Sequence, residues 1–305
     1  YVGKPPELGT DVFAMDTGNA AGTITPAFDS GFPVDFGFYK TVASTVDWIS
    51  GARLTGTKYM KPNGTDAETT SSDMIWDVNT GWQSWSGGTG VQAWMWKRHA
   101  GFDVVAYKGD HVDNRQIPHS LSKSPEMIWT KCRDTTDNWV VWHKGLTGTV
   151  ATGHILLNLT NASANAGVIY GGGNAVAPTS THWSVGTHET VNDDRYDYIS
   201  MLFSSVNGIS KVDKYEGNGN ASGPTVTLGF QPRLILIKAT ETTGNWIIIK
   251  VTGTGTTNNN GGYLDTNGAF YGAAYVDVSS TGFSITDNGS EVNQDGKNYI
   301  YYAHA

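Results

Sequence analysis

The chain has 305 residues, a formal net charge of −8 at pH 7 and a single cysteine, Cys132. The acidic balance excludes a nucleic-acid partner, because phosphate binding needs clustered lysine and arginine, and this chain spreads 20 basic residues among 28 acidic ones. One cysteine leaves no internal disulfide, which favours synthesis in a cytoplasm. No apolar stretch approaches the roughly 18 residues that a membrane helix needs, so we expect no membrane insertion.

Composition predicts an all-β fold. The chain contains 38 glycines and only 16% charged residues, and apolar positions do not recur with helical spacing. Short runs rich in valine, isoleucine, threonine and aromatic residues lie between clusters of glycine, asparagine, aspartate and serine, as strands and hairpin turns require. We therefore predict antiparallel β-sandwiches of a jelly-roll-like kind.

In chain order, the predicted strands repeat three times. Three openings that end in a glycine turn are DVFAMDTG (11–18), DVVAYKG (103–109) and KVDKYEG (211–217). Next, three lysines each close an apolar run and are followed eight positions later by a tryptophan: Lys40 with Trp48, Lys131 with Trp139, and Lys238 with Trp246. The closing aromatic strands are AWMW (93–96), YISML (198–202) and YIYYA (299–303). The pattern predicts three related sandwiches of about 100 residues, at 1–100 (the divergent copy), 101–207 and 208–305.

The repeat separates two kinds of aromatic residue. Trp48, Trp139 and Trp246 recur at one position, which is typical of a structural core. Aromatic residues that do not recur are better candidates for binding a ligand, and they are Trp76, Trp85, Trp94, Trp96, Trp142, Tyr170 and Tyr271. We expect any recognition surface in the stretches that differ between copies, namely 55–86, 147–181 and 252–275.

No motif for catalysis or cofactor binding is present. The sequence lacks a nucleophile elbow, a P-loop, a paired-histidine zinc motif and a cysteine metal spacing. Groupings such as 110–113 and 192–194 are interpreted as solvated loops and turns rather than metal or acid–base sites. We therefore predict no catalytic residues, no metal and no cofactor, and hence no enzyme.

Several segments resemble a known family. They are IPHSL (117–121), NWVVWHK (138–144), LLN (156–158), YEGNG (215–219), GFQPR (229–233), GNW (244–246), GF (282–283) and YIYYA (299–303). The family is a set of tandem β domains of unknown function in tail-fibre-like structural proteins of marine tailed bacteriophages. The resemblance covers about two thirds of the chain well and the first 100 residues more weakly. It implies a virion protein and carries over no catalytic residue.

These expectations favour a tail-fibre or appendage protein at the virion surface that attaches to the host. Its expected partners are other virion proteins and a host-surface glycan or protein. A homotrimer would match the usual oligomeric state of tail fibres. Two alternatives stay open: a purely structural capsid knob, decoration or fibre-shaft protein, and, further off, a glycan depolymerase, which would need two carboxylates flanking a bond.

Overall fold

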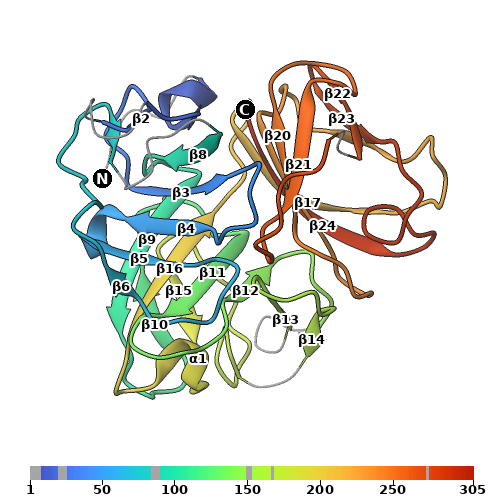
Figure 1. Cartoon of the computed structure of the whole chain (residues 1–305). Helices are drawn as coiled ribbons and strands as arrows, with labels where there is room; N and C mark the ends of the chain where they lie inside the picture. The colour runs from blue at the N-terminus through green and yellow to red at the C-terminus, as the bar shows by residue number, and fades with distance from the viewer. Residues whose placement is uncertain (1–7, 20–25, 84–89, 149–152, 166–167, 273–274) are drawn as a thin grey trace.

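The protein is represented by a computed structural model, and the residues that it describes are 8–19, 26–83, 90–148, 153–165, 168–272 and 275–305 (Figure 1). The predicted all-β class is confirmed, with antiparallel strands throughout the described residues. The helical elements there are one short α-helix, α1 (Glu189–Asn192), and two 3-10 helices, η1 (Gly9–Asp11) and η2 (Arg53–Thr55). No helix among those residues is long and apolar enough to cross a membrane. We call 1–100, 101–207 and 208–305 the first, second and third segments.

Each segment contributes one large sheet. The first sheet has the order β1 (Phe13–Asp16), β8 (Val91–Trp96), β3 (Phe36–Thr41), β4 (Ile49–Ala52), β5 (Lys58–Met60) and β6 (Thr69–Thr70). The second has β9 (Phe102–Lys108), β16 (Asp197–Phe203), β11 (Met127–Cys132), β12 (Val140–His143), β13 (Gly153–Leu156) and β14 (Ala164–Asn165). The third has β17 (Ser210–Glu216), β24 (Asn298–His304), β19 (Leu234–Ala239), β20 (Ile247–Val251) and β21 (Asn259–Tyr263).

The strand order is the same in all three sheets. The opening strand pairs with the closing strand, which pairs with the strand carrying the repeated lysine, and the strand after the repeated tryptophan follows. A smaller sheet accompanies each large one. The smaller sheets are β2 (Phe28–Asp29) with β7 (Gly81–Trp82), β10 (Arg115–Pro118) with β15 (His182–Val185), and β18 (Thr225–Thr227) with β23 (Gly282–Ile285) and β22 (Val276–Ser279).

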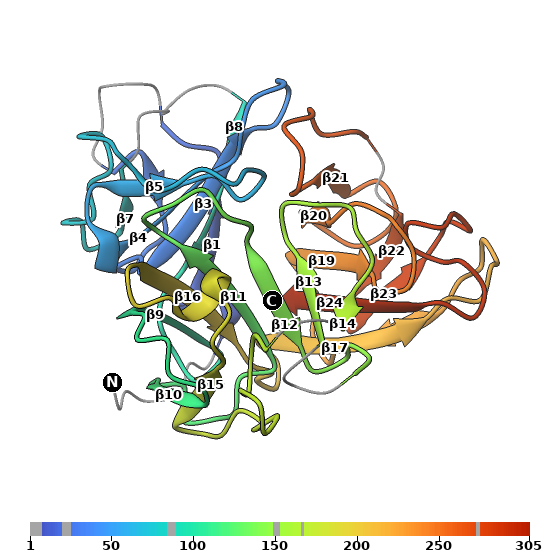
Figure 2. The same cartoon turned by 90° about the horizontal axis from the view of Figure 1, so that it is seen from below.

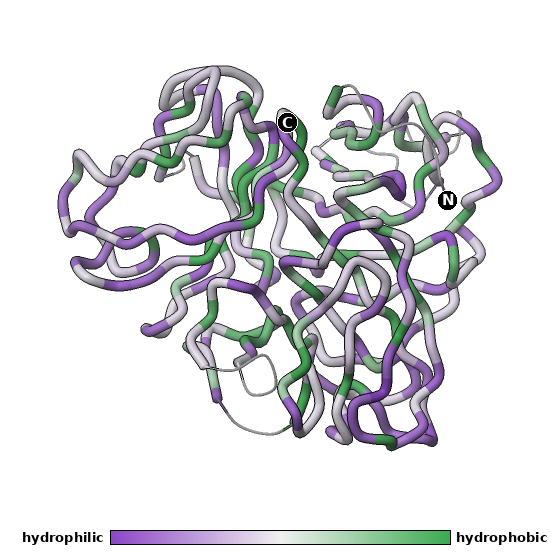
Figure 3. The backbone as a smooth tube through the Cα atoms, turned by 180° about the vertical axis from the view of Figure 1, so that it is seen from behind, coloured by the Kyte–Doolittle hydropathy of each residue, from purple (hydrophilic) through white to green (hydrophobic). Residues whose placement is uncertain are grey.

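The large sheets bury both of their faces. One face of each contributes to a single central core that draws residues from all three segments. The opposite face packs in a core of its own segment, together with residues of the small sheet. Strand β19 shows why its sequence is continuously apolar, since Leu234 and Leu236 point into the central core while Ile235 and Ile237 point into the outer one. In Figure 3 the hydrophobic stretches accordingly lie along the inner strands and the hydrophilic ones along the outer loops.

The repeated tryptophans join neighbouring segments. Each is buried, and its indole Nε1 donates to a backbone carbonyl of another segment at 2.8 to 3.0 Å. The pairs are Trp48 with Tyr263, Trp139 with Lys61, and Trp246 with Leu156. The first segment therefore bonds to the third, the third to the second and the second to the first, which closes a ring (Figure 2).

A backbone hydrogen bond repeats beside each tryptophan contact. The donor and acceptor pairs are Glu68 N–H to Arg133 O, Ser163 N–H to Thr240 O, and Phe270 N–H to Val42 O, at 2.7 to 2.8 Å. Every acceptor lies two residues after a repeated lysine. The three seams between segments therefore have one geometry, which the sequence repeat encodes.

The repeated lysines are fully buried, and carbonyl oxygens satisfy their charge. Lys40 Nζ donates to Asn267 O across a seam at 2.9 Å, and Lys238 Nζ donates to Thr160 O across another at 3.0 Å. Lys131 Nζ instead donates within its own segment, to Cys132 O and Thr135 O. Burial lowers the pKa of Lys40 and of Lys238 to about 8.

Candidate functional site

The candidate aromatic residues of the closing strand lie in the central core. Trp94 and Trp96 alternate on one face of β8, and neither exposes more than 1% of its surface. The Trp96 Nε1 lies 3.2 Å from the Tyr302 hydroxyl of the third segment. In this structure both indoles fill the space between sheets and are out of reach of a ligand in solvent.

Three further candidates lie in the outer cores. The ring of Trp76 packs 4.7 Å from that of Trp82 at a tilt of 41°, and its Nε1 donates to Gly56 O. Trp142 and Tyr170 pack together in the outer core of the second segment, where Tyr170 donates to Thr130 Oγ1 at 2.7 Å. All three are at least 93% buried. Trp85 lies outside the described residues.

A pocket of about 360 Å³ opens on the first segment, over strands β3, β4 and β5. Its lining combines aromatic rings, an apolar floor and charged groups, as small-molecule sites do. The lining residues are Tyr39, Thr41, Val46, Asp47, Ile49, Tyr59, Lys61, Ser71, Asp73 and Met74. Tyr59, Lys61 and Asp73 belong to 55–86, one of the stretches in which we expect a recognition surface.

Two charged groups in this pocket are held in place by each other. Lys61 Nζ lies 3.1 Å from Asp47 Oδ2 and 3.3 Å from Asp66 Oδ2. A hydrogen bond from Asn63 and the pairing with Lys61 lower the pKa of Asp47, and the bond to Asp47 raises the pKa of Lys61. Both groups are therefore charged at neutral pH and ready to bind a polar ligand.

The aromatic wall of the pocket is fixed from behind. The ring of Tyr39 packs 5.4 Å from that of Phe28 and 6.0 Å from that of Trp82. Tyr59 is half-buried on β5, opposite Gly51. Glycine at position 51 leaves room for the side chains of Met74 and Trp76, which a Cβ would meet at 2.4 and 3.0 Å. The backbone thus comes close to the floor of the pocket.

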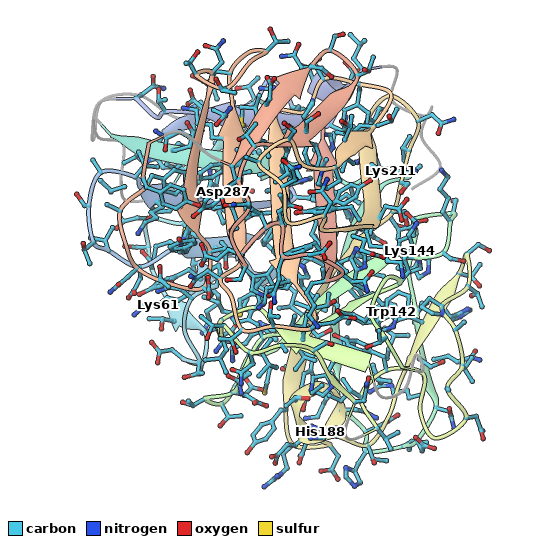
Figure 4. The ribbon with its side chains drawn as sticks, turned by 90° about the vertical axis from the view of Figure 1, so that its right-hand side faces the viewer. Lys61, Trp142, Lys144, His188, Lys211 and Asp287 are labelled. Carbon is cyan, nitrogen blue, oxygen red and sulfur yellow. The ribbon has the colours of Figure 1, made fainter. Side chains whose placement is uncertain are left out.

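The second segment has a pocket of about 250 Å³ at the equivalent position. Counting from the repeated tryptophan, Asp47 corresponds to Asn138 and Ile49 to Val140. The strand registers make Tyr59 equivalent to His154, because these residues pair with Thr69 and Ala164, and place Leu156 where the first segment has Lys61. The remaining lining is Ala164, Ile169, His188 and Thr190. Figure 4 shows Lys61 and His188 far apart at the edge of the molecule.

The third segment fills the equivalent position with its own side chains. Tyr263 stands where the first segment has Lys61, and Tyr271 pairs with Gly261 as Thr69 pairs with Tyr59. A Cβ at Gly261 would lie 2.9 Å from the Tyr271 ring, so that ring occupies the space of the Tyr59 side chain. This places the half-buried candidate Tyr271 inside an aromatic cluster.

A carboxylate organises this cluster. Tyr263 and Tyr275 both donate their hydroxyl groups to Glu291 Oε2 at 3.0 Å, and Asn245 Nδ2 donates to Oε1 at 2.8 Å. The Tyr271 ring packs 5.1 Å from Tyr263 and 5.7 Å from Tyr275. The third segment therefore shows that this position accommodates flat rings whose hydroxyl groups bind a carboxylate.

No three histidine, cysteine, aspartate or glutamate side chains gather to hold a metal among the residues that the structure describes. Asp193, in the grouping 192–194, and Glu291 both have protein partners. Arg195 forms a two-point pair with Asp193, at 2.8 and 2.7 Å, and Glu291 binds the tyrosines described above.

The fold and the pockets define a class: an all-β protein in which three equivalent antiparallel sheets close around one core and present repeated ligand-sized pockets. The chain belongs to the family described as Domain of unknown function (DUF7483), which matches residues 11–305. That match spans all three segments as one unit. No curated protein and no solved structure matches the chain.

The sequence singled out none of Tyr39, Asp47 and Lys61 as a candidate, although Lys61 lies in the stretch 55–86. Tyr39 and Asp47 flank the repeated lysine and tryptophan, a neighbourhood that the repeat marked as core. The useful signal was a comparison of the copies: the tryptophan is invariant, whereas the residue before it is Asp47, Asn138 or Asn245. A position that varies beside an invariant core residue is where a shared fold can carry a different site.

Proposed function

We propose that this protein is a bacteriophage virion component, of a tail fibre or appendage, that attaches to the host by binding a surface saccharide in the pocket of the first segment. The observation that carries the proposal is the pocket itself, where Tyr39 and Tyr59 stand beside the charged pair Asp47 and Lys61. A pyranose ring offers an apolar face for the tyrosines and hydroxyl groups for the charged residues.

The third segment supports this choice of ligand. Its tyrosine hydroxyls donate to Glu291 at the position equivalent to the pocket. A hydroxylated ring bound to a carboxylate is thus an arrangement that this fold already forms internally. In the first segment Asp47 and Asp73 line the open space instead, and a sugar hydroxyl could donate to either.

Binding fits the pocket better than cleavage does. A glycosidase needs one carboxyl group whose pKa is raised so that it can donate a proton. The pKa of Asp47 is lowered by Asn63 and Lys61. Among the described residues, two carboxyls have a raised pKa, those of Asp137 and Asp265, and neither lines this pocket.

The virion setting rests on the resemblance to phage structural domains and on the lack of disulfides. A structure held by a buried ring of seams, without cross-links, suits assembly in a reducing cytoplasm followed by exposure outside the cell. Attachment at the virion surface would use other virion proteins as partners.

A saccharide titration tests the proposal. A panel of neutral, amino and acidic monosaccharides and of host-surface polysaccharide is titrated into the protein by calorimetry. We expect binding that weakens at least tenfold in Tyr59→Ala and in Asp47→Ala. Tyr196→Ala, a half-buried tyrosine outside the pocket, serves as the control and should bind as the natural protein does. No binding to any sugar, or equal binding by Tyr59→Ala, would remove the proposal.

A further inference from the structure

We infer that the pocket of the second segment is a second saccharide site, so that one chain binds two sugar residues. The inference rests on the proposed function of the first pocket and extends it to a different set of side chains. The second pocket lies over β12 and β13, beside helix α1. Its volume of about 250 Å³ lies below the range typical of drug-sized ligands, so we expect it to hold a single pyranose ring.

Structural equivalence is the first argument. The two pockets occupy the same place relative to the repeated tryptophan and to the strand pair that follows it. The fold therefore presents this hollow more than once, and the third segment closes its copy with Tyr271. The second segment has no tyrosine at that position, because its equivalent residue is Ala164. Because alanine is small, the pocket of the second segment stays open.

The chemistry of the lining is the second argument. Val140, Leu156 and Ile169 form an apolar floor, while Thr190 supplies a hydroxyl group and Asn138 an amide. His154 stands in place of Tyr59 and offers another flat ring. The site thus keeps the combination of a ring surface and hydrogen-bonding groups that suits a sugar.

The orientation of the His188 ring is set by the first turn of α1. As the N-cap of α1, its Nδ1 accepts from Thr190 N–H at 3.3 Å and lies 2.9 Å from Thr190 Oγ1. Since Nδ1 accepts, the proton of the neutral ring resides on Nε2, which is a donor for a ligand hydroxyl group. A pre-oriented donor of this kind reduces the entropy lost on binding.

Specificity should differ between the sites. The first pocket contains two carboxylates and one ammonium group, whereas none of the described residues that line the second is a lysine, arginine, aspartate or glutamate. The second pocket therefore fits a neutral pyranose, and the first also accommodates an amino sugar, whose positive charge Asp47 and Asp73 would attract. An amino sugar would distinguish the two pockets, because its positive charge should strengthen binding in the first pocket and not in the second.

The test counts sites with a neutral methyl hexopyranoside. Calorimetry of the full chain should give two sites, and histidine ring signals in NMR should shift on titration. Tyr59→Ala should retain one site together with those shifts. The double variant Ala164→Tyr with His154→Gly copies the arrangement of the third segment, so it should close the second pocket, leave one site and abolish the shifts. His154→Ala, a smaller change, should weaken the second site at least tenfold.

The possible results distinguish the saccharide site inferred in the second pocket from the one proposed in the first. One site that is lost in Tyr59→Ala and unaffected by both second-pocket variants would overturn this inference and leave the proposed function standing. One site that survives Tyr59→Ala but disappears when the second pocket is closed would support the inference and contradict the first pocket. No binding at all would reject both. Circular dichroism and thermal unfolding of each variant verify that it is folded.

Discussion

At the scale of single residues, Asp265 differs from its counterparts by one functional group. Asn63, Asn158 and Asp265 each accept from the backbone N–H of the repeated tryptophan. The two asparagines also donate through Nδ2, to Asp47 and to Asn138, whereas Asp265 Oδ2 is buried without a partner. A proton on Oδ2 would restore that donor, and burial raises the pKa of Asp265 to about 6.

This predicts a stability that falls as pH rises. In the folded protein Asp265 binds its proton up to about pH 6, while in the unfolded chain it loses the proton near 3.8. The folded state is therefore favoured below pH 4, and that contribution, up to about 3 kcal/mol, is lost between pH 4 and 6. Asp265→Asn should gain stability at pH 7.5 and none at pH 4. Urea unfolding at pH 7.5 and at pH 4 measures the difference in stability between Asp265→Asn and the natural protein. The same difference at both pH values would contradict a raised pKa for Asp265.

The seam tryptophans allow a matched comparison. Trp139→Phe loses the hydrogen bond to Lys61 O as well as ring volume. Trp129→Phe loses the same volume in the same core, but the Trp129 Nε1 has no partner. We expect Trp139→Phe to cost about 1–2 kcal/mol more, because it leaves a carbonyl unsatisfied. Chemical unfolding compares the two, and equal losses would show that the seam bond contributes nothing.

At the scale of elements, the stretch that follows β5 in the first segment contacts the second segment. Arg133 holds Glu68 through two bonds of 2.8 and 3.0 Å, beside the repeated backbone bond of this seam. The Glu68 side chain is 10% exposed. Removing its partner would leave a charge that is mostly buried, with Lys58 at the longer distance of 3.8 Å.

Arg133→Met should therefore destabilise the protein by about 2–3 kcal/mol. The control is Lys144→Met, whose partner Glu126 is 26% exposed and for which a loss of about 0–1 kcal/mol is expected. Denaturant midpoints at low and high salt compare the two. If Arg133→Met cost no more than Lys144→Met, the seam would not depend on this pair.

The same elements show how much the sequence could predict. The repeated lysine and tryptophan spacing located the equivalent strands, because hydrogen bonds to fixed carbonyls allow little change at those positions. The tryptophans of β8 were harder to interpret. Trp94 and Trp96 alternate on one face, as a strand with a buried side requires. Only the structure reveals that other segments cover that face, through Phe270, Phe102 and Tyr302. Pockets formed by three strands and a loop depend on such packing and leave no local pattern.

At the scale of the whole molecule, the closed ring makes each segment depend on its two neighbours. The three sheets share one core, and every segment donates to one neighbour and accepts from the other. A segment alone would expose the face that carries Leu234, Leu236 and Ile248, or its equivalent. The large sheets of the three segments share one strand order, and we expect the segments to form one folding unit.

Residues 208–305, expressed alone, should accordingly fail to form a stable native structure, and the full chain should unfold in one transition. NMR spectra of the isolated segment and calorimetry of the full chain measure this. A well-dispersed spectrum of the segment, or three separate transitions, would contradict a shared core. Retention of the native form at low protein concentration would further show that the ring needs no second chain.

The pocket of the first segment is tested most directly by a crystal structure of the protein grown with a saturating neutral hexopyranoside. We predict a pyranose ring packed against Tyr59, with a hydroxyl oxygen about 2.6–3.0 Å from a carboxylate oxygen of Asp47. An empty pocket in crystals whose sugar concentration exceeds the Kd measured in solution, with the sugar bound elsewhere on the chain, would contradict it.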